Sequence, residues 1–153
     1  MHLFRHALLG GMALVCGYAT AATLPNCASA IAQLPPEILN KINRKEVLEM
    51  VQSLNRQQQL PEKFIQKRAA QDAGWQPGRS LWATPELRGM SIGGDRFYNR
   101  SQALPSGTWF EADLDYQGER RRNAKRMVYN LKQRQQFITL DHYATFTGVP
   151  ACR

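Results

Sequence analysis

Apolar residues recur at helical spacing in the first half of the chain. Between residues 37 and 56 they are Ile38, Leu39, Ile42, Val47, Leu48, Val51 and Leu54, most of them on one face, which predicts an amphipathic helix. A second, shorter helix is predicted over 61–73, because Pro61 suits a helix start and Gly74 a helix stop. Residues 23–36 indicate a leader with proline breakers, and 74–90 indicate mostly loop, with one helical turn near 81–87.

From residue 91 onward the apolar period changes to that of strands. The segments concerned are 91–97, 108–116, 124–131, 135–140 and 145–149. In 108–116 the residues Phe110, Ala112, Leu114 and Tyr116 alternate with Trp109, Glu111, Asp113 and Asp115. Helices followed by short, closely connected strands predict an α+β fold with an antiparallel sheet.

The N-terminal segment predicts export. Residues 1–22 combine Arg5, an apolar run from Ala7 to about Cys16 and small residues up to Ala22, which is the pattern of a signal peptide. We expect cleavage after Ala21 or Ala22; Cys16 leaves a lipoprotein alternative open, although Val15 is bulky for that position. The rest, 23–153, is expected to form one domain, with an N-terminal extension and first helix in 23–59 and the main domain in 60–153.

After signal removal the chain keeps two cysteines, Cys27 and Cys152, and one histidine, His142. Cysteines of exported proteins usually pair, so a disulfide between Cys27 and Cys152 is predicted, with two unpaired thiols as the alternative. With so few such residues we expect no zinc-type cluster, no metal and no cofactor.

Charge narrows the class of partners. The chain carries 20 Lys and Arg against 12 Asp and Glu, a net charge of +8. Such a balance favours polyanions, namely nucleic acid, an anionic membrane or an acidic protein. We expect no membrane association after signal removal, and a monomer.

Candidate chemistry gathers in residues 109–143. A general base, fixed cations and a general acid suffice to cleave RNA when the 2′-hydroxyl is the nucleophile. Glu111 lies opposite the apolar face of its predicted strand, and His142 is near neutral in intrinsic pKa. The cations are Arg120, Arg121, Arg122 and Arg126. Spacing alone predicts that Lys67 is a solvated helix lysine.

Five blocks of sequence carry a resemblance to a known family. They are L-P-E-K-F-I-Q-K-R-A-A-Q-D-A-G-W (60–75), S-I-G-G-D-R-F-Y-N-R (91–100), T-W-F-E-A-D-L-D-Y (108–116), R-N-A-K-R-M-V-Y (122–129) and D-H-Y-A-T-F-T (141–147). Together they resemble the secreted bacterial ribonucleases typified by barnase and binase, the guanyl-specific microbial ribonucleases. The resemblance implies N-terminal helices packed on a twisted antiparallel sheet. It also implies metal-independent cleavage of RNA through a 2′,3′-cyclic phosphate to a 3′-phosphate.

The resemblance assigns roles to single residues. By position, Glu111 is similar to the family's general base and His142 to its general acid. Lys67, Arg122 and Arg126 resemble the cations around the scissile phosphate, which replaces the solvated interpretation of Lys67.

Substrate binding is implied for a second group. Asp95 resembles the acid that holds the lysine, and Tyr143 a residue that binds the nucleotide beside the acid. The loop similar to the family's guanine-recognition loop consists of Phe97, Tyr98, Asn99, Arg100 and Ser101.

Two departures affect what the resemblance implies. Ser101 stands where the family has glutamate, and a hydroxyl accepts less strongly than a carboxylate, so guanine preference is in doubt. The 117–121 turn has an additional residue and more arginine, which predicts stronger, more salt-dependent phosphate binding.

The sequence leaves several functional alternatives open. A non-catalytic basic module that binds RNA or another polyanion, and a ribonuclease toxin against competing cells, both fit the composition. The family also implies an acidic inhibitor similar to barstar, and the sequence does not decide whether this chain meets one. Secretion to the medium and to the periplasm are equally compatible with the sequence.

Overall fold

The computed structural model describes residues 23–153, so the predicted signal peptide lies outside the described residues. The helices are α1 (Cys27–Ile31), α2 (Pro36–Leu39), α3 (Arg44–Gln57) and α4 (Lys67–Asp72), with 3-10 turns η1 (Leu81–Ala83) and η2 (Pro85–Leu87). The strands are β1 (Phe64–Ile65), β2 (Ser91–Phe97), β3 (Trp109–Asp113), β4 (Arg126–Asn130), β5 (Gln135–Thr139) and β6 (Thr147–Gly148). Within 23–153 no helix combines the length and apolar character needed to cross a membrane.

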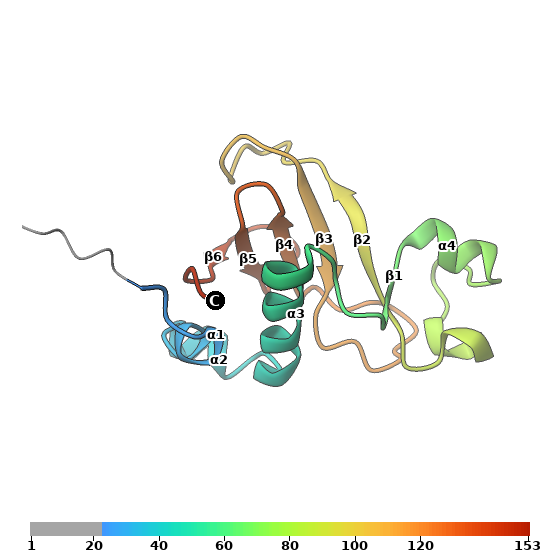
Figure 1. Ribbon diagram of the computed structural model, residues 1–153. Coiled ribbons are helices and arrows are strands. Elements are labelled where there is room, and N and C mark those ends of the chain that lie inside the picture. The colour runs from blue at the N-terminus through green and yellow to red at the C-terminus, as the bar shows by residue number, and fades with distance from the viewer. Residues whose placement is uncertain (1–22) are drawn as a thin grey trace, which may run out of the picture.

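The six strands form one sheet in the order β1-β2-β3-β4-β5-β6. Every pair is antiparallel except β1 with β2, which is parallel. The predicted α+β class is therefore confirmed. Figure 1 shows α3 lying across one face of the sheet, with α1 and α2 beside the β5–β6 end and α4 beyond β1.

The helix predicted over 37–56 is two helices. α2 ends at Leu39 and α3 begins at Arg44, because the Asn43 side chain accepts hydrogen bonds from the backbone amides of Lys45 and Glu46 and caps a new start. Residues 27–31, predicted as part of a leader, form α1, which is capped in the same way by Asn26. The apolar spacing predicted helical structure correctly, but capping residues decide where each helix begins.

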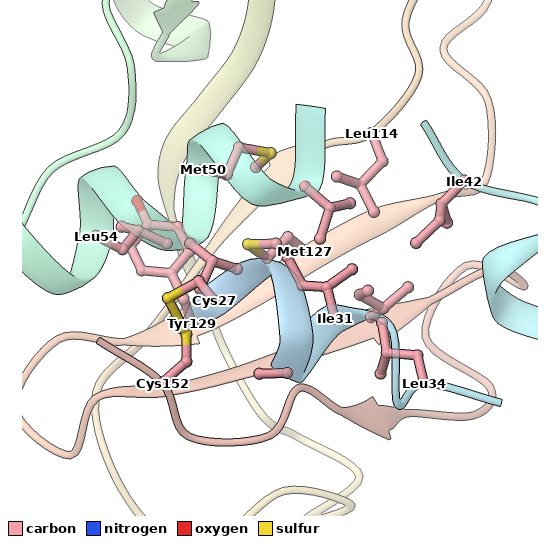
Figure 2. Close-up of a cluster of buried hydrophobic side chains, with 14 of the residues drawn as sticks. Cys27, Ile31, Leu34, Ile42, Met50, Leu54, Leu114, Met127, Tyr129 and Cys152 are labelled. Carbon is pink, nitrogen blue, oxygen red and sulfur yellow. A yellow bond between two sulfur atoms is a disulfide. The ribbon is translucent and has the colours of Figure 1, made fainter. Parts of the chain in front are cut away.

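The main core lies between α1–α3 and the sheet (Figure 2). Met50 and Leu54 of α3 meet Met127 and Tyr129 of β4, and Ile31 of α1 closes the cluster. The predicted alternation of β3 explains this, because Ala112 and Leu114 face the helices while Trp109 and Glu111 face away. The regular strand ends at Asp113, earlier than predicted.

A disulfide joins Cys27 in α1 to Cys152 near the C-terminus, as predicted. Its two cysteines belong to the main core, beside Leu54 and Tyr129 in Figure 2. Asn55 of α3 donates to the Cys152 carbonyl oxygen at 3.1 Å and accepts from Gln136 of β5 at 3.0 Å. The C-terminal residues are therefore held to α1, α3 and β5 at once.

The helix predicted over 61–73 begins late. Residues 64–65 form β1, which pairs with β2, and α4 begins at Lys67. The prediction was wrong because Phe64 and Ile65 gain backbone partners on the edge of the sheet, which helical spacing cannot reveal. Lys67 is thus the first residue of a helix rather than a mid-helix residue.

Candidate active site

The face of the sheet away from α3 carries the polar candidates in two rows. The strand register places Asp95 opposite Glu111, and Glu111 opposite Val128. The next row consists of Asp113 opposite Arg126 and Arg126 opposite Thr139. Residues directly opposite each other on one face interact most strongly, so the register brings Asp113 close to Arg126, whereas the cation that meets Glu111 comes from outside these rows.

Asp95 reaches this face because β2 contains a bulge. The pairing shifts between Gly93 and Asp95, and the extra residue, Gly94, has φ +94°. Asp95 then accepts a hydrogen bond from the backbone amide of Lys67 at 3.0 Å. Asp95 thus holds the lysine through the start of α4 rather than through its ammonium group.

Lys67, Glu111 and Tyr143 form a connected group. The Lys67 ammonium donates to Glu111 Oε1 at 3.0 Å, and the Tyr143 hydroxyl donates to Glu111 Oε2 at 2.5 Å. Glu111 is only 8% exposed. Burial, followed by the hydrogen bond to Glu111, holds the pKa of Tyr143 above its usual range, so this phenol stays a donor. The spacing argument for a solvated Lys67 is wrong, since half-exposed Lys67 is bound to the buried carboxylate.

Asp113 pairs with two arginines, Arg126 of its own row and Arg122, which precedes β4. Its Oδ1 lies 3.0 Å from Arg126 Nε and 3.5 Å from Arg122 Nη1. Neither nitrogen has hydrogen-bond geometry to any described residue, and the same is true of Asp113 Oδ2. Arg126 is further fixed by donating to the carbonyl oxygens of Asn123 and Lys125 at 2.6 and 2.7 Å. Both guanidinium groups are thus held in place beside the buried Asp113 carboxyl.

Asp113 has a perturbed pKa with a consequence for stability. Burial raises its pKa to about 6, although Arg126 and Arg122 oppose the shift. Such a carboxyl contributes stability that is present below its unfolded pKa and is lost as the pH rises through the folded value. We expect the free energy of unfolding of the wild type to fall by about 2 kcal/mol relative to Asp113→Asn between about pH 4 and pH 7. Urea unfolding of both proteins across this range measures the difference.

Asp72→Asn is the matched control, because Asp72 pairs with Arg68 on the exposed surface of α4. Its stability should follow the wild type across the same pH range. Parallel curves for the wild type and Asp113→Asn would contradict a raised pKa of Asp113.

A cavity of about 340 Å³, called the basic cavity below, is lined by four of the five predicted catalytic residues, Lys67, Arg122, Arg126 and His142. Glu111 adjoins it through Lys67. The cavity is also lined by Arg79, Arg120 and Arg121, and no Asp or Glu is among its lining residues. A space of this size walled by guanidinium groups suits phosphate, whose oxygens pair with the arginine fork.

His142 lies on an ordered turn at the edge of this cavity. Its backbone amide donates to the Ala124 carbonyl oxygen at 3.1 Å, and its ring centroid lies 4.8 Å from that of Tyr143. Asp141 holds the turn by accepting from the Thr145 amide and hydroxyl, and these bonds lower the pKa of Asp141 to about 2. Two residues in left-handed conformation, His142 and Tyr143, complete the turn.

A family described as ribonuclease matches residues 49–150. A ribonuclease of Bacillus pumilus is 34% identical, over 90% of this chain and 93% of that protein. The chain belongs to this ribonuclease family. Ribonucleases of Bacillus intermedius and Heyndrickxia coagulans are 42% and 41% identical over 63% of this chain, covering 59% and 88% of those proteins.

Both departures from the family pattern lie on the surface of this ribonuclease. Two hydrogen bonds hold the arginine-rich turn, residues 117–121. Ser80, at the start of η1, donates to the Gly118 carbonyl oxygen at 2.7 Å, and the Tyr116 hydroxyl donates to the Glu119 carbonyl oxygen at 2.9 Å. Arg120 itself donates to the Gly78 carbonyl oxygen at 3.2 Å. Arg120 and Arg121, which both line the cavity, therefore belong to a turn that hydrogen bonds hold in place.

The loop predicted to recognise the base, residues 97–101, does not line the cavity formed by the arginines. Phe97 connects it to the site, because its ring centroid is 5.1 Å from that of Tyr143. The Asn99 side chain exchanges two hydrogen bonds with the Leu104 backbone and closes the loop. Arg100 and Ser101 are exposed and line no part of the basic cavity.

Sequence reasoning missed two functional neighbours, Asp113 and Asp141. Alternation places Asp113 on the same strand face as Glu111, and this was the signal that could have identified it. Its position opposite Arg126 follows from the pairing of β3 with β4. In the sequence Asp141 stands out only as the residue before His142. Its hydrogen bonds with Thr145 form because the turn brings the two residues together.

Proposed function

We propose that this chain is an exported, metal-independent endoribonuclease that cleaves single-stranded RNA by transphosphorylation. The family supports the endoribonuclease activity. The observation that carries the mechanism is the cavity that Lys67, Arg122, Arg126 and His142 line together, with Glu111 bound to Lys67 beside it. The proposal includes a monomer in solution.

In the first step Glu111 accepts the proton of the 2′-hydroxyl. The freed oxygen attacks the adjacent phosphorus, and the bond from phosphorus to the 5′-oxygen breaks. His142 protonates that leaving oxygen, so a 2′,3′-cyclic phosphate and a 5′-hydroxyl result. Lys67, Arg122 and Arg126 meet the charge that develops on the phosphoryl oxygens, where prepositioned donors stabilise the transition state most.

In the second step water opens the cyclic phosphate. His142 accepts a proton from water, Glu111 returns one to the 2′-oxygen, and a 3′-phosphate forms. Tyr143 orients Glu111 through its hydrogen bond, which leaves the carboxylate bound on both oxygens and limits its rotation.

We further propose a guanine preference carried by the backbone of residues 97–101 and weakened by Ser101. An acidic inhibitor similar to barstar would suit the basic cavity, whose lining holds cations and no carboxylate. Export to the medium or the periplasm completes the proposal.

The deciding experiment uses the chain from Thr23 onward in EDTA. A short RNA should be cleaved to a product ending in a cyclic phosphate, whereas the same oligonucleotide with one 2′-deoxy substitution at the cleaved position should stay intact, as mass analysis of the ends will show. Guanine before the cleaved bond should react fastest, with a smaller advantage over the other bases than a glutamate at position 101 provides. Folded protein that binds RNA without cleaving it would instead favour the non-catalytic module.

A further inference from the structure

We propose that Tyr98, Arg96 and Arg100 form an accessory RNA-binding platform that stacks a base on the 5′ side of the cleaved nucleotide. This inference rests on the proposed ribonuclease function and extends it to a site outside the catalytic cavity. Tyr98 is 65% exposed, an unusual exposure for a large aromatic residue.

Two guanidinium groups flank the Tyr98 ring. The central carbon of Arg96 lies 5.8 Å from the ring centroid, and that of Arg100 lies 5.9 Å from it. None of the ion pairs found within 23–153 includes Arg96 or Arg100, so both charges face solvent without a carboxylate partner. An exposed aromatic ring with two unpaired cations close to it is the combination that binds a nucleobase together with its phosphates.

Strand alternation separates the platform from the catalytic face. Phe97 points toward Tyr143, whereas Arg96 is the cross-strand partner of Phe110, whose ring it also contacts on the side of the main core. A second cavity of about 670 Å³ is lined by the three platform residues and also by Gln102 and residues 104–107. Neither His142 nor any catalytic arginine lines this second cavity.

The platform is built before any RNA arrives. Leu104, which lines the second cavity together with Tyr98, is buried against Trp109 and its backbone exchanges two hydrogen bonds with the Asn99 side chain. The Trp109 indole donates to the Pro105 carbonyl oxygen at 2.9 Å, which fixes the far wall. A site that is already ordered loses less conformational entropy on binding.

The 5′-to-3′ direction of the RNA indicates which base Tyr98 would stack. The proposed function places the nucleotide before the cleaved bond at residues 97–101 and the leaving nucleoside near His142. A strand continuing in the 5′ direction from that loop moves away from the basic cavity. Tyr98 belongs to this loop, is 65% exposed and does not line the basic cavity, so the next upstream base is the group that its side chain would stack.

The test compares oligonucleotides that contain a single ribonucleotide and can therefore be cleaved at one bond. Two nucleotides are added on the 5′ side in one substrate and on the 3′ side in another. We expect the 5′ extension to raise kcat/KM for the wild type by roughly 5- to 100-fold, the range expected for stacking one base. Tyr98→Ala should lose this gain and Tyr98→Phe should keep it, while Arg96→Gln should keep only part. The gain from the 3′ extension should be the same in all four proteins, which also shows that each is folded.

A second readout does not depend on cleavage. An oligonucleotide with a 2′-deoxy group at the cleaved position carries 2-aminopurine in its 5′ extension, and its fluorescence should be quenched by the wild type but not by Tyr98→Ala. Quenching without cleavage of the ribonucleotide substrates would refute the proposed function and leave the stacking site standing. Cleavage with neither a 5′ gain nor quenching would overturn the platform, including the case in which this surface binds an acidic protein.

Discussion

Replacing Glu111 with glutamine is expected to lower kcat for RNA cleavage by about 10²- to 10⁴-fold, the usual contribution of a general base. Glutamine keeps the shape of the side chain and its hydrogen bond with Tyr143, but cannot take the proton of the 2′-hydroxyl. Affinity for RNA should change little, since the arginines of the basic cavity are untouched. Steady-state cleavage gives kcat, and titration with the uncleavable 2′-deoxy oligonucleotide gives Kd.

Glu49→Gln is the matched control, because this substitution makes the same chemical change at an exposed position of α3. It should cleave RNA at the wild-type rate. Normal turnover by Glu111→Gln would remove Glu111 from the role of base, whereas a loss of RNA affinity equal to the loss of rate would indicate a binding role instead.

Removing the disulfide is expected to cost stability by about 5 kcal/mol. The bond joins residues 125 apart in sequence, and closing so long a loop in the unfolded chain removes much of its conformational entropy. Urea unfolding of the wild type with and without reductant measures the effect as a lower midpoint. No residue of α1 or of 150–153 lines the basic cavity, so kcat should be retained while the reduced protein is folded.

The double variant Cys27→Ala and Cys152→Ala provides the control, since its unfolding midpoint should not respond to reductant. An unchanged midpoint for the wild type, in a sample where two free thiols are titrated after reduction, would show that packing of α1 and Asn55 holds the C-terminus without the bond.

Several features of this ribonuclease follow from the sequence by itself. Alternation in 108–116 placed Glu111 on the face opposite Ala112, because successive side chains of a strand point to opposite faces. Two cysteines remaining after a predicted export signal led to the prediction of the bond between Cys27 and Cys152. The five blocks of family sequence carried the fold and the family, which the comparisons confirm.

Tertiary structure decided the rest, because it depends on groups that are distant in sequence. Lys67 reaches Glu111 only because β1 pairs with β2 and delays the start of α4, and helical spacing carries no information about that pairing. Asp113 meets Arg122 and Arg126 through the register of β3 with β4 and the path of the arginine-rich turn. Local sequence determined which strand face most side chains take, whereas strand register and burial determined which charges meet and which residues line the basic cavity.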